Sequence, residues 1–189
     1  MCMGETRVVL SRQLGSETLH AAGKEERVKN MAVLLDNVRS AWNVGSILRS
    51  ADGFGFSHAF LCGITPSGDH EAVTKTSLGA EESVAWSYHK DAVKLVKGLK
   101  EEGWKVYGLE EDARATDIRQ AAPSQDSASV SDAPHVLILG NEVTGIDPEL
   151  LDLCDRIYSI PMRGEKKSFN VAIAFSIAAY ALRIESARS

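Results

Sequence analysis

The 189-residue sequence is poor in cysteine, in long apolar runs and in net positive charge. Its three cysteines, Cys2, Cys62 and Cys154, are too far apart to indicate a disulfide framework or a paired metal site, and they favour a reducing cytoplasm. The longest apolar run, residues 171–182, is too short to span a bilayer comfortably and predicts a buried helix. The polar N-terminus lacks the pattern of a signal peptide. We therefore expect a cytoplasmic protein without a membrane span.

Several familiar binding signatures are also missing. The net charge of −5 and the pI of about 5.6 exclude the generally basic surface of many nucleic-acid binders, so an anionic partner would need a local basic patch. The five histidines are scattered without the spacing of metal ligands, and we predict no metal site. No Gly-x-Gly-x-x-Gly segment occurs, which excludes the common dinucleotide fingerprint.

The loop at residues 139–148 brackets a possible ligand between Gly140 and Gly145. This glycine spacing is that of a phosphate-binding P-loop, but Ile146 and Asp147 replace the lysine and the hydroxyl residue that hold phosphate and Mg²⁺. Acidic Glu142 argues further against a phosphate. The loop instead suits a neutral or cationic ligand that is contacted by backbone amides.

What the sequence does contain is an alternation of apolar strands and helices. Its length and its 44% hydrophobic composition predict one globular domain, with residues 1–30 as an arm or short helices and residues 31–189 as the folded unit. The alternation predicts an α/β fold with a mostly parallel sheet and helices on both faces. We expect strands near residues 31–36, 59–62, 104–108, 135–139 and 157–160, and helices near residues 43–54, 91–102, from 148, and 171–182, the first of them capped by Asn43.

Three polar segments begin where predicted strands end, which is where open α/β sheets bind ligands. They are residues 36–51, 139–148 and 160–174. The first combines a helix N-terminus with Arg39 and Arg49, which suits a phosphate as well as it suits ordinary capping and surface charge. By contrast, the acidic runs 81–82 and 110–112 are expected to be mostly solvated faces, and residues 112–134 to be a loop with at most a short helix.

The third segment bends at a proline and a glycine before it enters the final apolar helix. Ser168 and Asn170 lie at the mouth of that helix, where both side chains can bond a ligand. Arg163, Lys166 and Lys167 form a local basic patch, although a run of charge alone often means only a solvated loop.

Taken in order, these segments resemble the SpoU (TrmH-type) RNA ribose methyltransferases of the SPOUT superfamily. The matching parts are Asn43-x-Gly-Ser-Ile-x-Arg49, Leu-Gly-Asn-Glu142-x-x-Gly145, and Ile-Pro-Met162 followed by Ser168-x-Asn170-Val, with residues 75–80 as a further similar segment. Each motif is weak alone, but the ordered set is specific and spans about residues 30–184.

The resemblance implies an α/β fold whose C-terminal segment forms a deep trefoil knot, and a homodimer whose active sites use both subunits. It implies S-adenosylmethionine as the cofactor. By position, the residues expected to contact that cofactor are Leu109, Leu139, Gly140, Gly145, Ile160, Met162 and Phe169.

The resemblance also implies roles for polar residues. Arg49 would activate the ribose 2′-hydroxyl, either as a base or by clamping a phosphate, and the other catalytic positions would be Asn43, Glu142, Ser168 and Asn170. RNA would contact Arg39, Arg163, Lys166 and Lys167. The expected reaction is 2′-O-methylation of RNA, with tRNA favoured over ribosomal RNA. A catalytically silent RNA-binding or assembly module and a small-molecule methyltransferase remain the alternatives.

Overall fold

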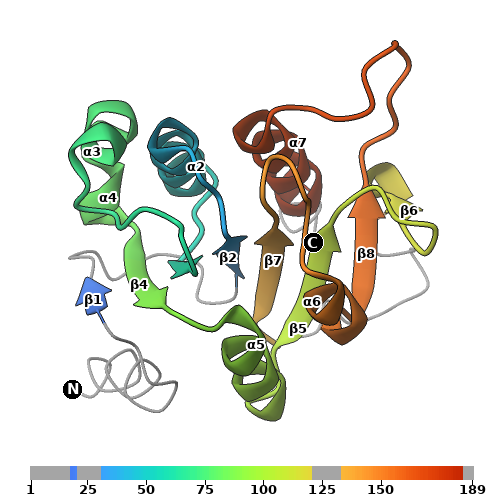
Figure 1. Cartoon of the computed structure of the whole chain (residues 1–189), viewed down its shortest axis with the longest axis horizontal. Coiled ribbons are helices and arrows are strands. Elements are labelled where there is room, and N and C mark those ends of the chain that lie inside the picture. The colour runs from blue at the N-terminus through green and yellow to red at the C-terminus, as the bar shows by residue number, and fades with distance from the viewer. Residues whose placement is uncertain (1–17, 21–30, 121–132, 185–189) are drawn as a thin grey trace.

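The computed structural model describes residues 18–20, 31–120 and 133–184, and its core is a sheet with helices on both faces (Figure 1). The strands are β1 (Thr18–His20), β2 (Met31–Asp36), β3 (His58–Cys62), β4 (Ala85–His89), β5 (Lys105–Leu109), β6 (Thr116–Asp117), β7 (His135–Leu139) and β8 (Arg156–Ser159). The helices are α2 (Ala41–Gly53), α3 (Glu71–Ser77), α4 (Ala80–Ser83), α5 (Ala92–Glu101), α6 (Pro148–Leu153), α7 (Val171–Ile184) and the 3₁₀ turn η1 (Ile118–Gln120).

The sheet order is β1-β4-β3-β2-β7-β5-β8-β6, and all neighbours run parallel except β1 and β4. This confirms the predicted α/β class and the mostly parallel sheet. Central strands β2 and β7 pair along their length, from Met31 opposite His135 to Leu35 opposite Leu139. Every residue of β2 is buried, as expected for a strand covered on both faces.

Two apolar layers hold the helices to the sheet. Helices α2 and α7 pack on one face through residues such as Ile47, Leu48 and Phe175. Helices α5 and α6 pack on the other through residues such as Leu99 and Leu150. Figure 1 shows the sheet between these two layers, and the predicted placement of helices on both faces is therefore confirmed.

Helix α2 begins earlier than predicted. Ser40, not Asn43, is the N-cap, because its hydroxyl oxygen accepts a hydrogen bond from the Asn43 backbone N–H at 3.3 Å. The prediction that Asn43 caps the helix was therefore wrong, and its side chain is released for other contacts. Within residues 112–134, β6 and η1 are ordered elements, whereas residues 121–132 lie outside the described part of the chain. Of the 1–30 arm, only β1 is described, and it is a strand.

Helix α7 is not buried on every side. Its inner face packs Ala172, Phe175 and Ala179 into the core, but Ile173 and Tyr180 are 52% and 59% exposed. The expectation of an all-round buried helix was thus wrong for its outer face. Among the residues described, no helix is long and apolar enough to cross a membrane.

Candidate functional site

A cavity of about 310 Å³ lies at the carboxyl ends of β5, β7 and β8. The loops that follow these three strands supply its walls, together with the first turn of α7. Every residue expected to contact the cofactor lines it: Leu109, Leu139, Gly140, Gly145, Ile160, Met162 and Phe169. Glu142, Ser168, Asn170 and Lys167 also line it. The predicted convergence of the second and third polar segments is therefore seen in the structure.

Glu142 joins the β7 loop to the start of α2. Its Oε2 accepts a hydrogen bond from the Arg39 backbone N–H at 3.0 Å, and its Oε1 accepts from the Ser40 N–H at 3.1 Å and from Asn43 Nδ2 at 2.9 Å. Burial raises the pKa of Glu142, but the donors on Arg39, Asn43 and Ser40 favour the charged form and leave that pKa below its ordinary value. The carboxylate is therefore ionised and fixes the first segment against the second.

A chain of amides extends this contact to the third segment. Asn43 donates to Glu142, and its Oδ1 accepts a hydrogen bond from Asn170 Nδ2 at 3.0 Å. Asn170 Oδ1 in turn accepts from the Ala172 backbone N–H at 2.9 Å, at the N-terminus of α7. The chain Glu142–Asn43–Asn170 thus links all three segments, and three of the five predicted catalytic residues belong to it.

The glycine loop after β7 is folded back on itself. Asn141 and Gly145 exchange backbone hydrogen bonds of 3.0 and 2.9 Å. A Cβ atom at Gly140 would lie 2.2 Å from the Gly145 carbonyl carbon and from the Ile146 nitrogen, so only glycine allows this approach. The loop is therefore compact, and Gly140, Asn141 and Gly145 line the cavity.

Glu110 was missed. It lines the cavity and is half-buried, and its Oε2 accepts a hydrogen bond from the Ile146 backbone N–H at 3.0 Å. The acidic run 110–112 was expected to be mostly a solvated face, and this residue departs from that expectation. Its position directly after strand β5 was the signal that could have found it, since ligands gather at strand ends.

Asn37 is a junction of three loops that sequence reasoning also missed. Its φ of 56° is in the left-handed region, which asparagine tolerates better than most residues. Its Oδ1 accepts from the Ile64 N–H at 3.2 Å, and its carbonyl oxygen accepts from Asn141 Nδ2 at 2.8 Å. These bonds hold the segment that presents the Arg39 and Ser40 N–H groups to Glu142.

Gly45 of the first motif serves packing and does not face the cavity. A Cβ atom there would lie 1.9 Å from Thr76 Oγ1 and 2.4 Å from the Val73 carbonyl oxygen. Helices α2 and α3 therefore approach closely only with glycine at this position. Of the further similar segment 75–80, Thr76 is thus the residue that lies against Gly45.

The basic residues are distributed around the cavity. Lys167 lines it, whereas Arg163 and Lys166 are exposed on the same segment and Arg39 is exposed at the start of α2. Arg49 is exposed on α2 outside the cavity lining, and it forms no hydrogen bond or ion pair with the described residues. Within those residues, no group of three or more His, Cys, Asp or Glu side chains is arranged to hold a metal ion.

Comparison with known proteins adds an independent finding. A model of the SpoU rRNA methylase family matches residues 30–180. The chain is 33% identical over 153 residues to the tRNA (guanosine(18)-2′-O)-methyltransferase of Thermus thermophilus, covering 80% of this chain and 73% of that protein. It is 30% identical over 151 residues to the 23S rRNA (guanosine(2553)-2′-O)-methyltransferase of Bacillus subtilis, covering 80% of this chain and 57% of that protein.

Among solved structures, the AdoMet-bound rRNA methyltransferase of Sinorhizobium meliloti matches with a TM-score of 0.72 at 26% identity, covering 82% of this chain and 56% of that one. The chain thus spans little more than half the length of the Bacillus and Sinorhizobium proteins. Since the family model covers well over half of the sequence and takes in all three segments that the Glu142–Asn43–Asn170 chain joins, the chain belongs to the SpoU family of RNA methyltransferases.

Proposed function

We propose that this chain methylates a ribose 2′-hydroxyl of RNA, with S-adenosylmethionine as the methyl donor. The observation that carries the proposal is the convergence of the second and third segments on one cavity, to which the Glu142–Asn43–Asn170 chain ties the first segment. Relatives with tRNA and rRNA 2′-O-methyltransferase names support the reaction class.

The cavity fits the proposed cofactor in size and in chemistry. Its volume of about 310 Å³ lies within the range of small-molecule sites. Leu109, Leu139 and Ile160 offer apolar walls, and the loop at Gly140 leaves backbone groups near the cavity without an intervening side chain. When bound, S-adenosylmethionine supplies a methyl group on a sulfonium for transfer to a nucleophilic oxygen. The AdoMet-bound Sinorhizobium structure supports the same assignment.

The chain's polar residues position the reacting RNA in this proposal. A guanidinium keeps its proton in proteins, so we assign Arg49 to clamping a phosphate and orienting the ribose hydroxyl. Arg49 stands on α2, whose first residues are held by Glu142. Asn43 and Asn170 act through their mutual hydrogen bond, and Ser168 at the cavity wall is a ligand for substrate or cofactor.

We propose tRNA as the substrate in preference to ribosomal RNA. The Thermus tRNA enzyme supports this choice, since the match covers 73% of it, whereas the match to the Bacillus rRNA enzyme covers 57%. Arg39, Arg163, Lys166 and Lys167 form the proposed RNA-facing rim of an otherwise acidic protein. Three widely spaced cysteines support a cytoplasmic location.

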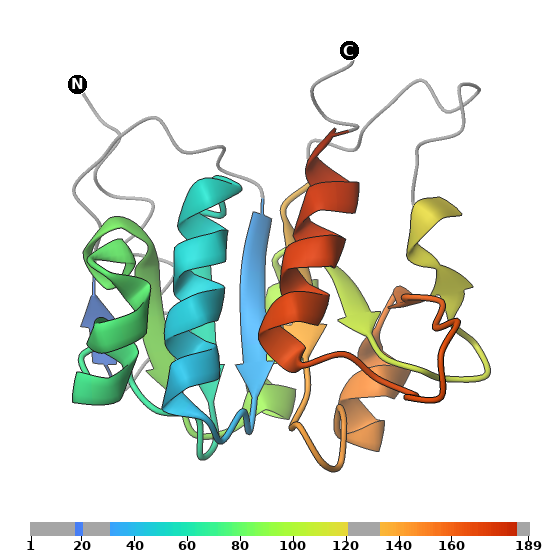
Figure 2. The ribbon, with the colours of Figure 1, turned by 90° about the horizontal axis from the view of Figure 1, so that it is seen from above.

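We also propose that the chain is a homodimer formed through α2 and α7. Trp42 of α2 and Ile173 and Tyr180 of α7 are 58%, 52% and 59% exposed, and these helices pack against each other. Figure 2 shows the two helices side by side on one face of the sheet. Exposed apolar residues that gather on one face favour association, and a second subunit on this face would stand beside Arg49.

A trefoil knot is the topology we propose for the C-terminal half. Strand β8 lies between β5 and β6, although β5 and β6 are consecutive strands in the sequence. The chain then returns to place α7 against α2 and η1. This order of strands supports threading of the last segment.

The test is methyl transfer from labelled S-adenosylmethionine into total tRNA and total rRNA, followed by nucleoside analysis. We expect a 2′-O-methylated nucleoside, with more label in tRNA. No 2′-O-methylated product in either pool would refute the proposed reaction, and label confined to rRNA would refute the preference for tRNA.

A further inference from the structure

The walls of the cavity carry an unequal set of charges. Glu110, Glu111 and Glu142 line it, against one lysine, Lys167. Glu142 is occupied by three donors from the start of α2. Glu110 and Glu111, which we call the acidic wall, belong to the loop after β5 and have no such commitment to α2.

Glu110 is held in a fixed place on this wall. Its Oε2 accepts from the Ile146 N–H and its Oε1 accepts from the Glu111 N–H, each at 3.0 Å. The backbone N–H of Glu110 donates to the Tyr158 carbonyl oxygen at 2.9 Å. A Cβ atom at Gly145 would lie 2.4 Å from Oε2, so the carboxylate packs directly on the glycine loop. Both oxygens keep acceptor capacity beyond these single bonds.

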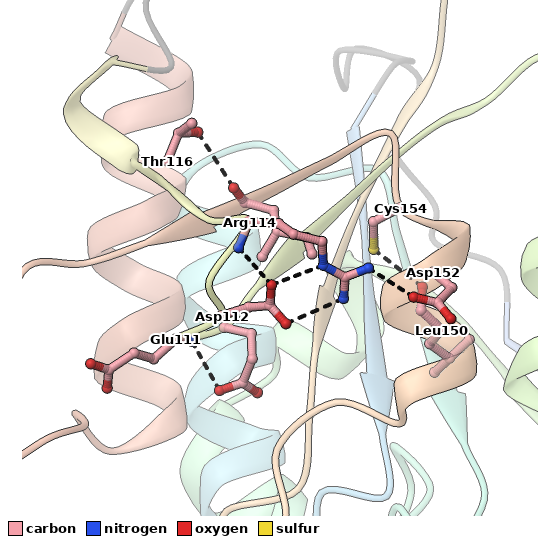
Figure 3. A network of polar contacts seen from close by, with 9 residues as sticks. Glu111, Asp112, Arg114, Thr116, Leu150, Asp152 and Cys154 are labelled. Carbon is pink, nitrogen blue, oxygen red and sulfur yellow. Dashed lines mark hydrogen bonds and ion pairs between the residues drawn. The ribbon is translucent and has the colours of Figure 1, made fainter.

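The segment that carries the acidic wall is fastened at its far end. Arg114 lies between Asp112 and Asp152 of α6, as Figure 3 shows, with Nε to Asp112 Oδ1 at 2.9 Å and Nη1 to Asp152 Oδ1 at 2.7 Å. Thr116 Oγ1 donates to the Ile157 carbonyl oxygen at 3.4 Å. Residues 110–116 are thus tied to α6, to β8 and to the glycine loop, and the wall charges are positioned in advance of any ligand.

From this geometry we infer that Glu110, assisted by Glu111, selects the cationic methyl donor over the neutral product. The inference rests on the proposed function. Methyl transfer forms a bond between the methyl carbon and the ribose oxygen and breaks the bond between that carbon and sulfur; the electron pair of the broken bond stays on sulfur, and the hydroxyl proton is released to solvent. S-adenosylmethionine and S-adenosylhomocysteine therefore differ by one methyl group and one positive charge. Negative charge fixed at the cavity binds the donor more tightly and leaves the product free to depart.

The experiment is calorimetric binding of S-adenosylmethionine, S-adenosylhomocysteine and sinefungin, in which a protonated amine replaces the sulfonium. It compares the full-length chain with Glu110→Gln, Glu111→Gln and the control Glu149→Gln. Glutamine keeps an acceptor for the Ile146 N–H but removes the charge. Glu149 is exposed on α6 and is absent from the cavity lining, so it controls for loss of one carboxylate elsewhere.

We expect Glu110→Gln to lower the preference for donor over product about tenfold, a value between those that Coulomb's law gives for a close charge pair in water and for one near a protein surface. The loss should appear with S-adenosylmethionine and sinefungin, while binding of S-adenosylhomocysteine stays nearly constant. Glu111→Gln should give a smaller change in the same direction, and Glu149→Gln none. In the unmodified protein, raising the salt concentration to about 0.5 M should reduce the preference.

An unchanged preference in both wall variants would overturn the inference and leave the proposed function intact. If Glu110→Gln fails to fold, Glu111→Gln and the salt dependence decide the matter, and no effect in either overturns the inference. Absence of binding of either nucleoside to the unmodified protein would instead overturn the proposed function.

Discussion

The two helical layers of this molecule are built alike on the inside and differently on the outside. Helix α5 turns Leu95, Val96 and Leu99 into the core, and helix α7 does the same with Phe175, Ala178 and Ala179. Outside, α5 presents lysines, whereas α7 presents Ile173 and Tyr180.

The α5/α6 layer has a completed polar surface. Lys97 pairs with Glu149 of α6 at 2.9 Å, and Lys100 pairs with Asp155, which follows α6, at 3.0 Å, so the lysines of α5 face carboxylates. Such exposed pairs contribute little to stability, but they show a surface adapted to water.

The α2/α7 layer is different in each respect. It contains the Asn43–Asn170 hydrogen bond and, further along the helices, a contact of 2.9 Å between Ser50 Oγ and Ser176 Oγ. It also exposes Trp42, Ile173 and Tyr180. The pattern of buried apolar residues is thus alike in the two layers and reports only the fold. The two layers differ in the residues on their outer faces and at their helix ends, and these residues carry the information about function.

Among substitutions that test the difference between the two layers, we expect the largest effect on activity at Arg49 of α2. Arg49→Ala should reduce turnover roughly a thousandfold, because the group that clamps the RNA phosphate and orients the ribose hydroxyl is lost. Binding of S-adenosylmethionine should hardly change, since Arg49 lies outside the cavity lining. Single-turnover methyl transfer and calorimetry measure the two quantities.

The matched control removes an exposed cation from the opposite layer. Lys94→Ala on α5 should leave both turnover and cofactor binding unchanged. A collapse of cofactor binding in Arg49→Ala would show that Arg49 is not on the substrate side.

The next effect concerns the exposed apolar face. Ile173→Lys and Tyr180→Lys should each weaken the proposed dimer about a hundredfold, which is the size of a central interface residue. Sedimentation velocity over a range of concentrations measures this change. Glu101→Lys on the exposed end of α5 adds a lysine to the other layer and should leave association unchanged. If the unmodified protein sedimented as a monomer, the proposal that the α2/α7 face is a dimer interface would be refuted.

The sequence predicted the fold best where burial is complete. Strands β2 and β7 are continuous apolar runs covered on both faces, and both were predicted at their observed limits. Strand β4 was missed because its sequence, Ala-Trp-Ser-Tyr-His, is mixed in polarity, and its position depends on pairing with β3. Two-residue β6 exists only through its pairing with β8. Local pattern cannot encode such partners.

The position of the site in the fold could be predicted from the sequence, but the hydrogen bonds that connect its residues could not. Because parallel strands end at one edge of a sheet, the polar segments after them were expected to meet, and all seven expected cofactor residues line the cavity. Glu142 accepts a hydrogen bond from Arg39, which is 103 positions away in the sequence. Glu110 accepts one from Ile146, which is 36 positions away. No local rule gives those pairings, which depend on the order of the strands.

The smallest predicted effect concerns the layer that contains α5, and it is a change of protein stability with pH. His58 Nε2 lies 2.8 Å from Ser87 Oγ, which lies 2.9 Å from His89 Nε2, and the ring of His89 contacts Phe60. Burial lowers the pKa of His89 to about 4. A histidine in the unfolded chain titrates near 6.5.

As the pH falls from 7 to 5, the unfolded chain gains a proton that folded His89 does not take up. The free energy of unfolding should therefore fall by roughly 2 kcal/mol over this interval from His89 alone. Glu142, whose pKa is lowered, stabilises the fold above its unfolded-state pKa of about 4.5 and should contribute no comparable slope between pH 7 and 5. Urea unfolding of the unmodified protein and of His89→Gln at both pH values isolates the difference, because the other histidines are common to both. If the free energy of unfolding changed equally with pH in the two proteins, His89 would be protonated in the folded state at pH 5. The surroundings of His89 next to the α5 layer would then be accessible to water.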